Sequence, residues 1–194
     1  DGTPLRITSV AGSFPASQSF IEVKALEVAM AIESGADEID IVLNPGLMLS
    51  GHEAEAASEV ELLREEAKDV VLKVIIESGA LKTPELIRRA SLVSMFAGAD
   101  FIKTSTGKID VAATPEAAFV MCHAIKDYYN LTGRKVGFKA AGGVRTPEDA
   151  ALYYTIVEEV LGEEWLTTDL FRIGASSAAN NLISAIEDKV VNYF

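Results

Sequence analysis

The stretch GADFIKTSTGK, residues 98–108, combines a helix exit, a buried strand and a polar loop. Glycine leads the chain out of a helical segment, the apolar residues that follow predict a strand, and small hydroxyl residues then begin a loop. A faint repeat of its start, GADEID at residues 35–40, occurs two units earlier and places Asp40 at the position equivalent to Lys103. The chain therefore repeats one unit in which a strand alternates with a helix.

Short β-rich runs alternate with amphipathic segments along the whole chain. Threonine followed by proline marks three helix starts, at Thr83, Thr114 and Thr146, because the hydroxyl caps a helix and proline suits its first position. Ser19 with Glu22 fits a capping box. The pattern predicts strands at 6–10, 38–43, 70–76, 100–104, 135–140 and 170–173, and helices at 19–33, 53–68, 84–96, 115–129, 147–161 and 178–190.

Repeated strand-helix units favour an α/β fold with a parallel sheet. The sheet either closes into a (β/α)8 TIM barrel or stays open and doubly wound, and units built alike on one axis favour the barrel. Only six βα units are present in this chain, two fewer than the barrel needs. Either the first two units are missing, so that residues 1–194 form a single barrel domain that is incomplete at its N-terminal side, or the sheet is open.

The composition excludes several classes of protein. With 194 residues, 49% hydrophobic and 24% charged, the chain is long enough for one buried core. No apolar run approaches the length of about 18 residues that spans a bilayer, and the net charge of -12 argues against nucleic acid or an anionic membrane as partner. The single cysteine cannot form an internal disulfide, which leaves the cytoplasm as the expected location.

Among the charged residues within the predicted strands, we single out four that stand where apolar residues are expected: Asp40, Lys73, Lys103 and Lys139. Side chains alternate along a strand, so all four are expected on the face opposite the covering helices, inside the barrel. One interpretation is a buried ion network that only fixes strand register. An excess of positive charge, however, lowers the pKa of at least one amine, and a neutral amine forms a Schiff base with a carbonyl. The residues alone leave open which lysine attacks, and Asp40 is the candidate proton carrier.

Two glycine-containing turns end the last two predicted strands. AAGGVRTPED, residues 140–149, and FRIGASSAAN, residues 171–180, each lead into a helix. Backbone N–H groups at such turns form an anion site, and the corresponding loops of (β/α)8 barrels often bind phosphate. The alternative is that glycine only eases two ordinary turns. The candidate phosphate-binding residues here are Gly142, Gly143, Arg145, Gly174, Ser176 and Ser177.

No cofactor is expected from the motifs. Gly107 and Lys108 suggest a nucleotide loop, but Ile109 follows the lysine and the required earlier glycine is missing. The two histidines, His52 and His123, lie far apart with no ligand cluster near them, so zinc chemistry has little support.

Five ordered segments, GADEIDIVLN, LKVIIESGALK, GADFIKTSTGK, GFKAAGGVRT and FRIGASS, closely resemble the deoxyribose-phosphate aldolases, which are class I aldolases on a (β/α)8 barrel. The resemblance runs from about Ile7 to the last helix. It implies that Lys103 is the Schiff-base lysine, Lys139 the lysine that perturbs it, and Asp40 the proton-relay acid. It places Gly107, Gly142, Gly143, Gly174, Ser176 and Ser177 around a substrate phosphate. To these we add Lys108 and Arg145 as phosphate contacts, with Lys73 and Thr104 in support.

The reaction that the resemblance implies is reversible cleavage of 2-deoxy-D-ribose 5-phosphate to glyceraldehyde 3-phosphate and acetaldehyde, with no metal or organic cofactor. The expected partners are therefore a small phosphorylated sugar and an aldehyde. The first two βα units of the family have no counterpart before residue 7, so closure by association into a homo-oligomer is one expectation. The alternatives are a catalytically silent phosphosugar-binding barrel, a truncated fragment, and another Schiff-base lyase on the same fold.

Overall fold

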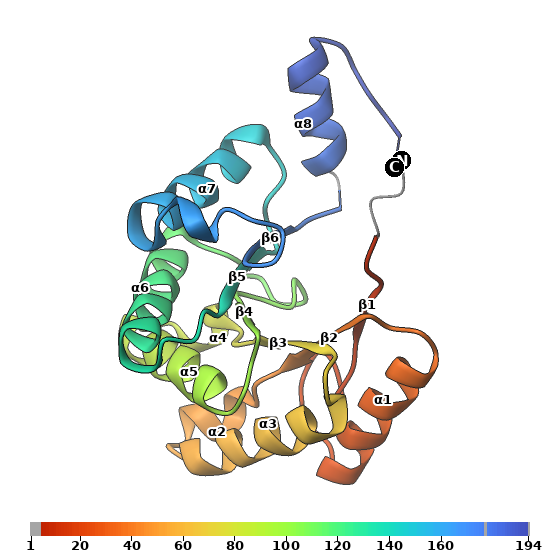
Figure 1. The fold of residues 1–194 in the computed structure, drawn as a ribbon, viewed down its shortest axis with the longest axis vertical. Helices are drawn as coiled ribbons and strands as arrows, with labels where there is room; N and C mark the ends of the chain where they lie inside the picture. Colours follow the sequence, from red (N-terminus) through yellow and green to blue (C-terminus); the bar gives the residue numbers. More distant parts are fainter. Residues whose placement is uncertain (1–4, 177, 194) are drawn as a thin grey trace.

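The computed structural model, which describes residues 5–176 and 178–193, wraps a layer of helices around a curled parallel sheet (Figure 1). The strands are β1 (Thr8–Val10), β2 (Glu38–Val42), β3 (Val71–Ile75), β4 (Phe101–Lys103), β5 (Gly137–Ala141) and β6 (Phe171–Gly174). The helices are α1 (Ile21–Glu33), α2 (Pro45–Leu49), α3 (Glu53–Ala67), α4 (Ser78–Leu81), α5 (Pro84–Phe96), α6 (Pro115–Thr132), α7 (Pro147–Leu161) and α8 (Ala178–Glu187), with a 3-10 turn, η1 (Glu163–Trp165).

The sheet has the order β1-β2-β3-β4-β5-β6, and each strand pairs in parallel with the next. This order follows the chain without reversal, whereas a doubly wound sheet has a point at which the order switches direction. The prediction of an α/β fold of the barrel type with six units is therefore confirmed, and the doubly wound alternative is wrong. Within the described residues β1 and β6 are the two ends of the sheet, which forms a curled half-barrel (Figure 1).

The two faces of the sheet divide as the alternation predicts. Side chains on the outer face pack under the helices in the main hydrophobic core, where each is 0% exposed: Ile39, Ile41, Val74, Ile102 and Phe138. The residues between them point into the curl, among them Asp40, Lys73, Lys103 and Lys139, whose ion pairs lie there. The same strands therefore supply the core through one face and the charged interior through the other.

Helix starts follow the threonine-proline signals. The hydroxyls of Thr83, Thr114 and Thr146 accept hydrogen bonds from the backbone N–H groups of Leu86, Ala117 and Asp149. The capping box predicted at Ser19 is wrong, because the N-cap residue of α1 is Phe20, which makes no side-chain capping hydrogen bond. The Ser19 hydroxyl is instead hydrogen-bonded to that of Ser13.

Several boundaries differ from the prediction by one to three residues, and two of them have a visible cause. Strand β1 begins at Thr8 and not at residue 6, and the Arg6 side chain bonds Glu38 and Asp169. Helix α8 ends at Glu187 because Asp188 takes a φ of +50°, which a right-handed helix does not allow. The loops after β2 and β3 contain the short helices α2 and α4, which the sequence pattern does not predict.

The start of β5 is anchored by Trp165, the single tryptophan of the chain. Its side chain is 2% exposed, and its indole Nε1–H donates to the carbonyl oxygen of Val136 at 3.0 Å. The ring packs edge-on against Tyr129, and the Lys135 ammonium lies 4.5 Å from its centre. This contact fixes η1, and with it the chain that leads into β6, against the preceding βα unit.

Candidate active site

Two lysines from neighbouring strands share one carboxylate oxygen in the interior of the sheet. Lys103 on β4 and Lys139 on β5 are register partners. Their Nζ atoms lie 2.8 Å and 3.0 Å from Oδ2 of Asp40 on β2. Lys73 on β3 donates to the other oxygen, Oδ1, at 2.9 Å. Three ammonium groups therefore converge on a carboxylate that is 1% exposed.

This charge imbalance shifts protonation equilibria in the cluster. Burial by itself raises the pKa of Asp40, but the charges of Lys103, Lys139 and Lys73 outweigh it and hold the pKa at about 2. Burial lowers the pKa of Lys139, and the positive charges of Lys103 and Lys73 add to that effect against the opposing attraction of Asp40. The cluster thus combines a firmly ionised acid with an amine that gives up its proton more readily than a free lysine.

A second group of charges lies one step further towards the amino ends of the strands. Glu38 on β2 is 0% exposed and accepts hydrogen bonds from Arg172 at 3.0 Å, Arg6 at 3.2 Å and Thr8 at 3.0 Å. Lys73 completes the set, with its Nζ 2.6 Å from Glu38 Oε2. Sequence reasoning missed Glu38 and Arg172, although Glu38 is two residues before Asp40 and therefore shares its strand face.

A polar cavity of about 480 Å³ opens where the carboxyl ends of β4, β5 and β6 meet. Lys103 and Lys139 contribute to its lining, and Asp40 lies beneath them, bonded to both. The turns after the three strands supply the remaining predicted contacts: Gly107, Lys108, Gly142, Gly143, Arg145, Gly174 and Ser176. Ser177 lies outside the described residues. Thr106, Val144 and Ala175 also line the cavity, although no motif singled them out.

Glycine is required at two places in these turns. Gly142 has a φ of +82°, and a Cβ there would lie 2.7 Å from Cβ of Ala112. Gly174 faces a similar restriction, since a Cβ would lie 2.8 Å from Cβ of Ala141. A side chain at either position would push the turns apart, so glycine keeps the backbone close enough to form the wall of the cavity.

One part of the expected anion site is already satisfied within the protein. The backbone N–H groups of Arg145 and Thr146, at the start of α7, both donate to the Asp149 carboxylate, at 2.9 Å and 3.0 Å. These two N–H groups, just before α7, are therefore occupied within the protein, and the anion site stays a prediction for the other groups of the turns. The remaining candidates for an anion contact are the glycine turns and the side chains of Lys108, Arg145 and Ser176, which line the cavity.

Two predicted supporting residues lie outside the cavity wall. The Thr104 hydroxyl, 0% exposed, donates to the carbonyl of Ala141 and accepts from its N–H, both at 2.9 Å, and so ties the end of β4 to β5. Lys73 is 0% exposed and lies beneath the catalytic candidates, between Glu38 and Asp40. Both hold neighbouring groups in place and neither lines the cavity.

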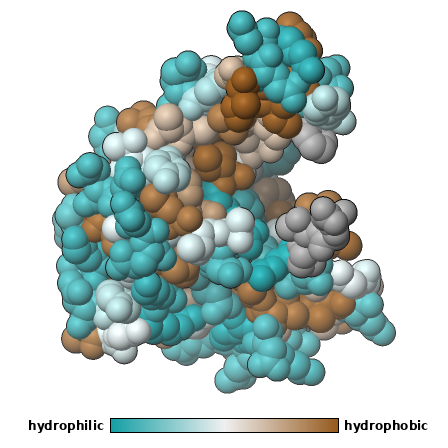
Figure 2. Space-filling model, turned by 45° about the horizontal axis from the view of Figure 1, so that its top comes forward, coloured by the Kyte–Doolittle hydropathy of each residue, from teal (hydrophilic) through white to brown (hydrophobic). Residues whose placement is uncertain are grey.

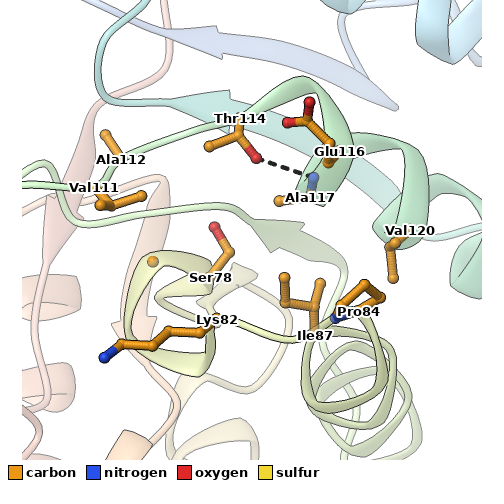
Figure 3. Close-up of a pocket in the computed structure, with 11 residues that line it drawn as sticks. Ser78, Lys82, Pro84, Ile87, Val111, Ala112, Thr114, Glu116, Ala117 and Val120 are labelled. Carbon is orange, nitrogen blue, oxygen red and sulfur yellow. Dashed lines mark hydrogen bonds between the residues drawn. The ribbon is translucent and has the colours of Figure 1, made fainter.

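The loop after β4 separates this cavity from a second one. Glu77 holds the loop, since its carboxylate accepts from the N–H and the hydroxyl of Thr106. Behind the loop, a cavity of about 330 Å³ lies between α4, α5 and the start of α6, with mostly apolar walls that include Ile87 and Val111 (Figure 3). None of the predicted catalytic or phosphate-binding residues lines it.

The described residues contain no group of three or more histidine, cysteine, aspartate or glutamate side chains placed to hold a metal ion. Among those same residues, no helix is both long and apolar enough to cross a membrane.

Parallel strands that curl around a lysine-lined interior, and open at their carboxyl ends onto a polar cavity, define part of a (β/α) barrel with an interior amine site. Comparison with known proteins then narrows this class. The profile of the DeoC/LacD family of aldolases matches residues 4–177. The chain belongs to the DeoC/LacD aldolase family.

Individual relatives agree with this assignment. The chain is 45% identical over 192 residues to the deoxyribose-phosphate aldolase of Mus musculus and 42% identical to that of Homo sapiens. Each match covers 99% of this chain and 59% of the relative, so the chain spans about three fifths of the length of these curated relatives. A solved deoxyribose phosphate aldolase from Aeropyrum pernix, described as tetrameric, has 31% identity and a TM-score of 0.71, covering 94% of this chain and 68% of the other.

Proposed function

We propose that this chain carries the catalytic site of a class I aldolase that reversibly cleaves 2-deoxy-D-ribose 5-phosphate to glyceraldehyde 3-phosphate and acetaldehyde. The observation that carries the proposal is the shared carboxylate: Lys103 and Lys139 both contact Asp40 Oδ2 at the floor of the polar cavity. Family membership and the named relatives support the reaction. Because the chain spans about three fifths of those relatives, substrate and activity belong to the proposal.

Geometry narrows the choice of nucleophile to two lysines. Lys73 is 0% exposed and held between two carboxylates, so a substrate carbonyl in the cavity does not reach it. Lys103 and Lys139 both line the cavity. Because burial lowers the pKa of Lys139, more of its amine is unprotonated and able to accept a proton from its neighbour, and the resemblance assigns the covalent role to Lys103. In this proposal Lys103 attacks and Lys139 takes up its proton.

The reaction proceeds through covalent intermediates on Lys103. Its neutral amine adds to the C1 aldehyde carbon of the open-chain sugar, and loss of water gives an iminium ion. A base removes the proton of the C3 hydroxyl, C3 becomes the aldehyde carbon as the C2–C3 bond breaks to release glyceraldehyde 3-phosphate, and the electron pair of that bond forms an enamine between C1 and C2. Protonation of the enamine at C2 restores an iminium, which water hydrolyses to acetaldehyde and free Lys103. Asp40 and Lys139 carry the protons between these steps.

The glycine turns are proposed to hold the phosphate of the substrate. They lie at the end of the cavity formed after β5 and β6, where barrels often bind this group. Lys108 and Arg145 add positive charge locally, which offsets the net charge of -12 carried by the whole chain. A phosphate bound there would place the sugar carbonyl towards the lysines at the floor.

Reductive trapping tests the proposal. Acetaldehyde with borohydride is expected to leave a two-carbon adduct on Lys103, located by peptide mass spectrometry. Lys103→Arg, which keeps the charge without a free amine nucleophile, is the matched control and should carry no adduct at residue 103. Folded protein with Lys103 unmodified would refute the proposal, whereas an adduct on Lys139 would exchange the two roles. Turnover that survives Lys103→Ala would point to a different lyase.

Self-association is part of the proposal. Large apolar side chains are exposed along α1, namely Val23, Leu26 and Met30, at 44%, 59% and 57%. Others follow α8, where Ile186 is 81% exposed, and Figure 2 shows apolar surface near the top of the molecule, where α8 lies. Exposed apolar area of this kind favours contact with another protein surface. Light scattering at two concentrations should report a mass above that of the monomer, and a monomer at both would refute this part.

A further inference from the structure

Glu38 is the most heavily contacted side chain of the interior that the mechanism above does not use. It is 0% exposed and lies two residues before Asp40 on β2, with its side chain on the same face of the strand. Its carboxylate receives Lys73 from β3 at 2.6 Å and Arg172 from β6 at 3.0 Å. Arg6 and Thr8, at the start of the sheet, donate to it as well, at 3.2 Å and 3.0 Å.

Lys73 links this carboxylate to the catalytic candidates. Its ammonium is 2.6 Å from Glu38 and 2.9 Å from Oδ1 of Asp40, so both acids share its charge. With Lys73 held on Oδ1, the other oxygen of Asp40 faces Lys103 and Lys139. The orientation of the Asp40 carboxylate, and the charge it offers to the two cavity lysines, therefore depend on how firmly Glu38 retains Lys73.

We propose that Glu38 is a positioning residue of the aldolase site, which acts through Lys73 to orient Asp40 and to limit the positive charge that Asp40 must balance. The inference rests on the function proposed above. If Glu38 were neutral, Lys73 would turn its full charge on Asp40, which would then accept protons less readily. The cluster would also become more positive, and an amine in it would lose its proton at lower pH.

Every strand contributes a group to this balance. Arg6 precedes β1, Thr8 lies on β1, Asp40 and Glu38 on β2, and the remaining cations are Lys73 on β3, Lys103 on β4, Lys139 on β5 and Arg172 on β6. Arg172 is the register partner of Lys139. Glu38 thus connects both ends of the sheet to the layer beneath the cavity, and a purely structural role, holding β1 and β6 in place, is the competing explanation.

The test follows the pH at which Lys103 forms its adduct. Acetaldehyde and cyanoborohydride are applied across pH 5 to 9 to the wild-type chain and to Glu38→Gln, and the adduct on Lys103 is quantified by mass spectrometry. In Glu38→Gln, the pH of half-maximal trapping should fall by about one unit. Where retro-aldol turnover is measured, kcat should drop on the order of tenfold while KM stays within about twofold.

Two further variants separate positioning from stability. Glu59→Gln removes the carboxylate partner of another buried lysine, Lys24, outside the sheet interior, and should leave the trapping midpoint unchanged. The double variant Glu38→Gln/Lys73→Met removes the unbalanced cation together with its acid, and should return the trapping midpoint towards wild type, while kcat stays low because Oδ1 of Asp40 has lost Lys73. Recovery in the double variant supports positioning even where Glu38→Gln alone does not fold.

Three results overturn parts of the argument separately. A folded Glu38→Gln with wild-type midpoint and kcat refutes the positioning role. A folded double variant whose trapping midpoint stays about one unit below that of the wild type also refutes it, because the shift then does not run through the charge of Lys73. Absence of a Lys103 adduct in the wild-type chain refutes the proposed function itself.

Discussion

Two buried lysines of this protein have opposite surroundings. Lys24 on α1 is 0% exposed, and its ammonium pairs with Glu59 at 2.8 Å, a carboxylate with no other cation on it among the described residues, and with the Ser17 hydroxyl at 3.0 Å. Lys103 on β4 is 8% exposed, shares its carboxylate oxygen with Lys139, and borders a cavity. A carboxylate that pairs with one lysine neutralises the charge of that buried ammonium group and fixes its position. A carboxylate that two lysines share leaves positive charge unbalanced, and this excess favours the neutral amine that reacts with a carbonyl.

Replacing each of the two lysines in turn should give the largest difference between them. Lys103→Ala is expected to lower retro-aldol turnover by about a thousandfold or more, because it removes the covalent nucleophile. Lys24→Met should keep turnover and instead lower the free energy of unfolding by about 1–3 kcal/mol, because Glu59 loses its partner. Turnover assays and urea unfolding of both variants measure the two effects. Equal loss of turnover in both would remove the distinction between the two lysines.

Lys139 supplies the second cation of the shared carboxylate. Lys139→Leu should lower turnover by about a hundredfold and move the acid limb of the pH–rate profile to higher pH, since Lys103 then has Asp40 to itself and holds its proton more firmly. Lys139→Arg, which retains the charge, should keep the limb near its wild-type position. An unchanged profile in Lys139→Leu would show that the sharing of Asp40 has no bearing on the chemistry.

The cavity beside Lys103 distinguishes it further from Lys24. Ser176→Asp places a negative charge in the cavity wall and should raise KM for the phosphorylated sugar by about tenfold or more. Thermal stabilisation by the sugar phosphate should be lost as well. Deoxyribose without its phosphate is the control substrate, and its turnover should change little. Equal weakening of both substrates would place the phosphate elsewhere.

The smallest expected effect is on the stability of the folded protein at acidic pH. Glu38 and Asp40 each have a pKa of about 2 in the folded protein, below their ordinary values of 4.5 and 3.8. Their contribution to stability is therefore present above about pH 4.5 and is lost as the pH falls towards 2. Urea unfolding followed by circular dichroism between pH 6 and 3 should show this loss, and Glu38→Gln should make the decline shallower. A decline of the same steepness in both proteins would contradict the depressed pKa of Glu38.

The fold was predictable because it rests on local signals. Alternation separated Ile39 and Ile41 from Asp40, and threonine-proline pairs located three helix starts. The capping box at Ser19 failed because the side chain has a closer partner in the neighbouring loop, Ser13. A local pattern does not reveal such competition across a turn.

The cluster was predictable in membership but not in detail. Strand alternation brought Lys73, Lys103 and Lys139 together with Asp40, but only the curl of the sheet decides which two share an oxygen. The pairing of Glu38 with Arg172 was not predicted, because the two residues are 134 positions apart in the sequence and come together only in the folded sheet. The capping of α7 by Asp149 was also hidden, since the turn reads equally well as an anion site.

The buried indole of Trp165 gives this chain a convenient optical reporter. As the single tryptophan, 2% exposed and bonded to the start of β5, it should emit at short wavelength in the native state and shift to the red on exposure to water. Its ring does not line the cavity beside Lys103. Emission wavelength should therefore follow the integrity of the sheet, while remaining insensitive to whether the cavity is filled.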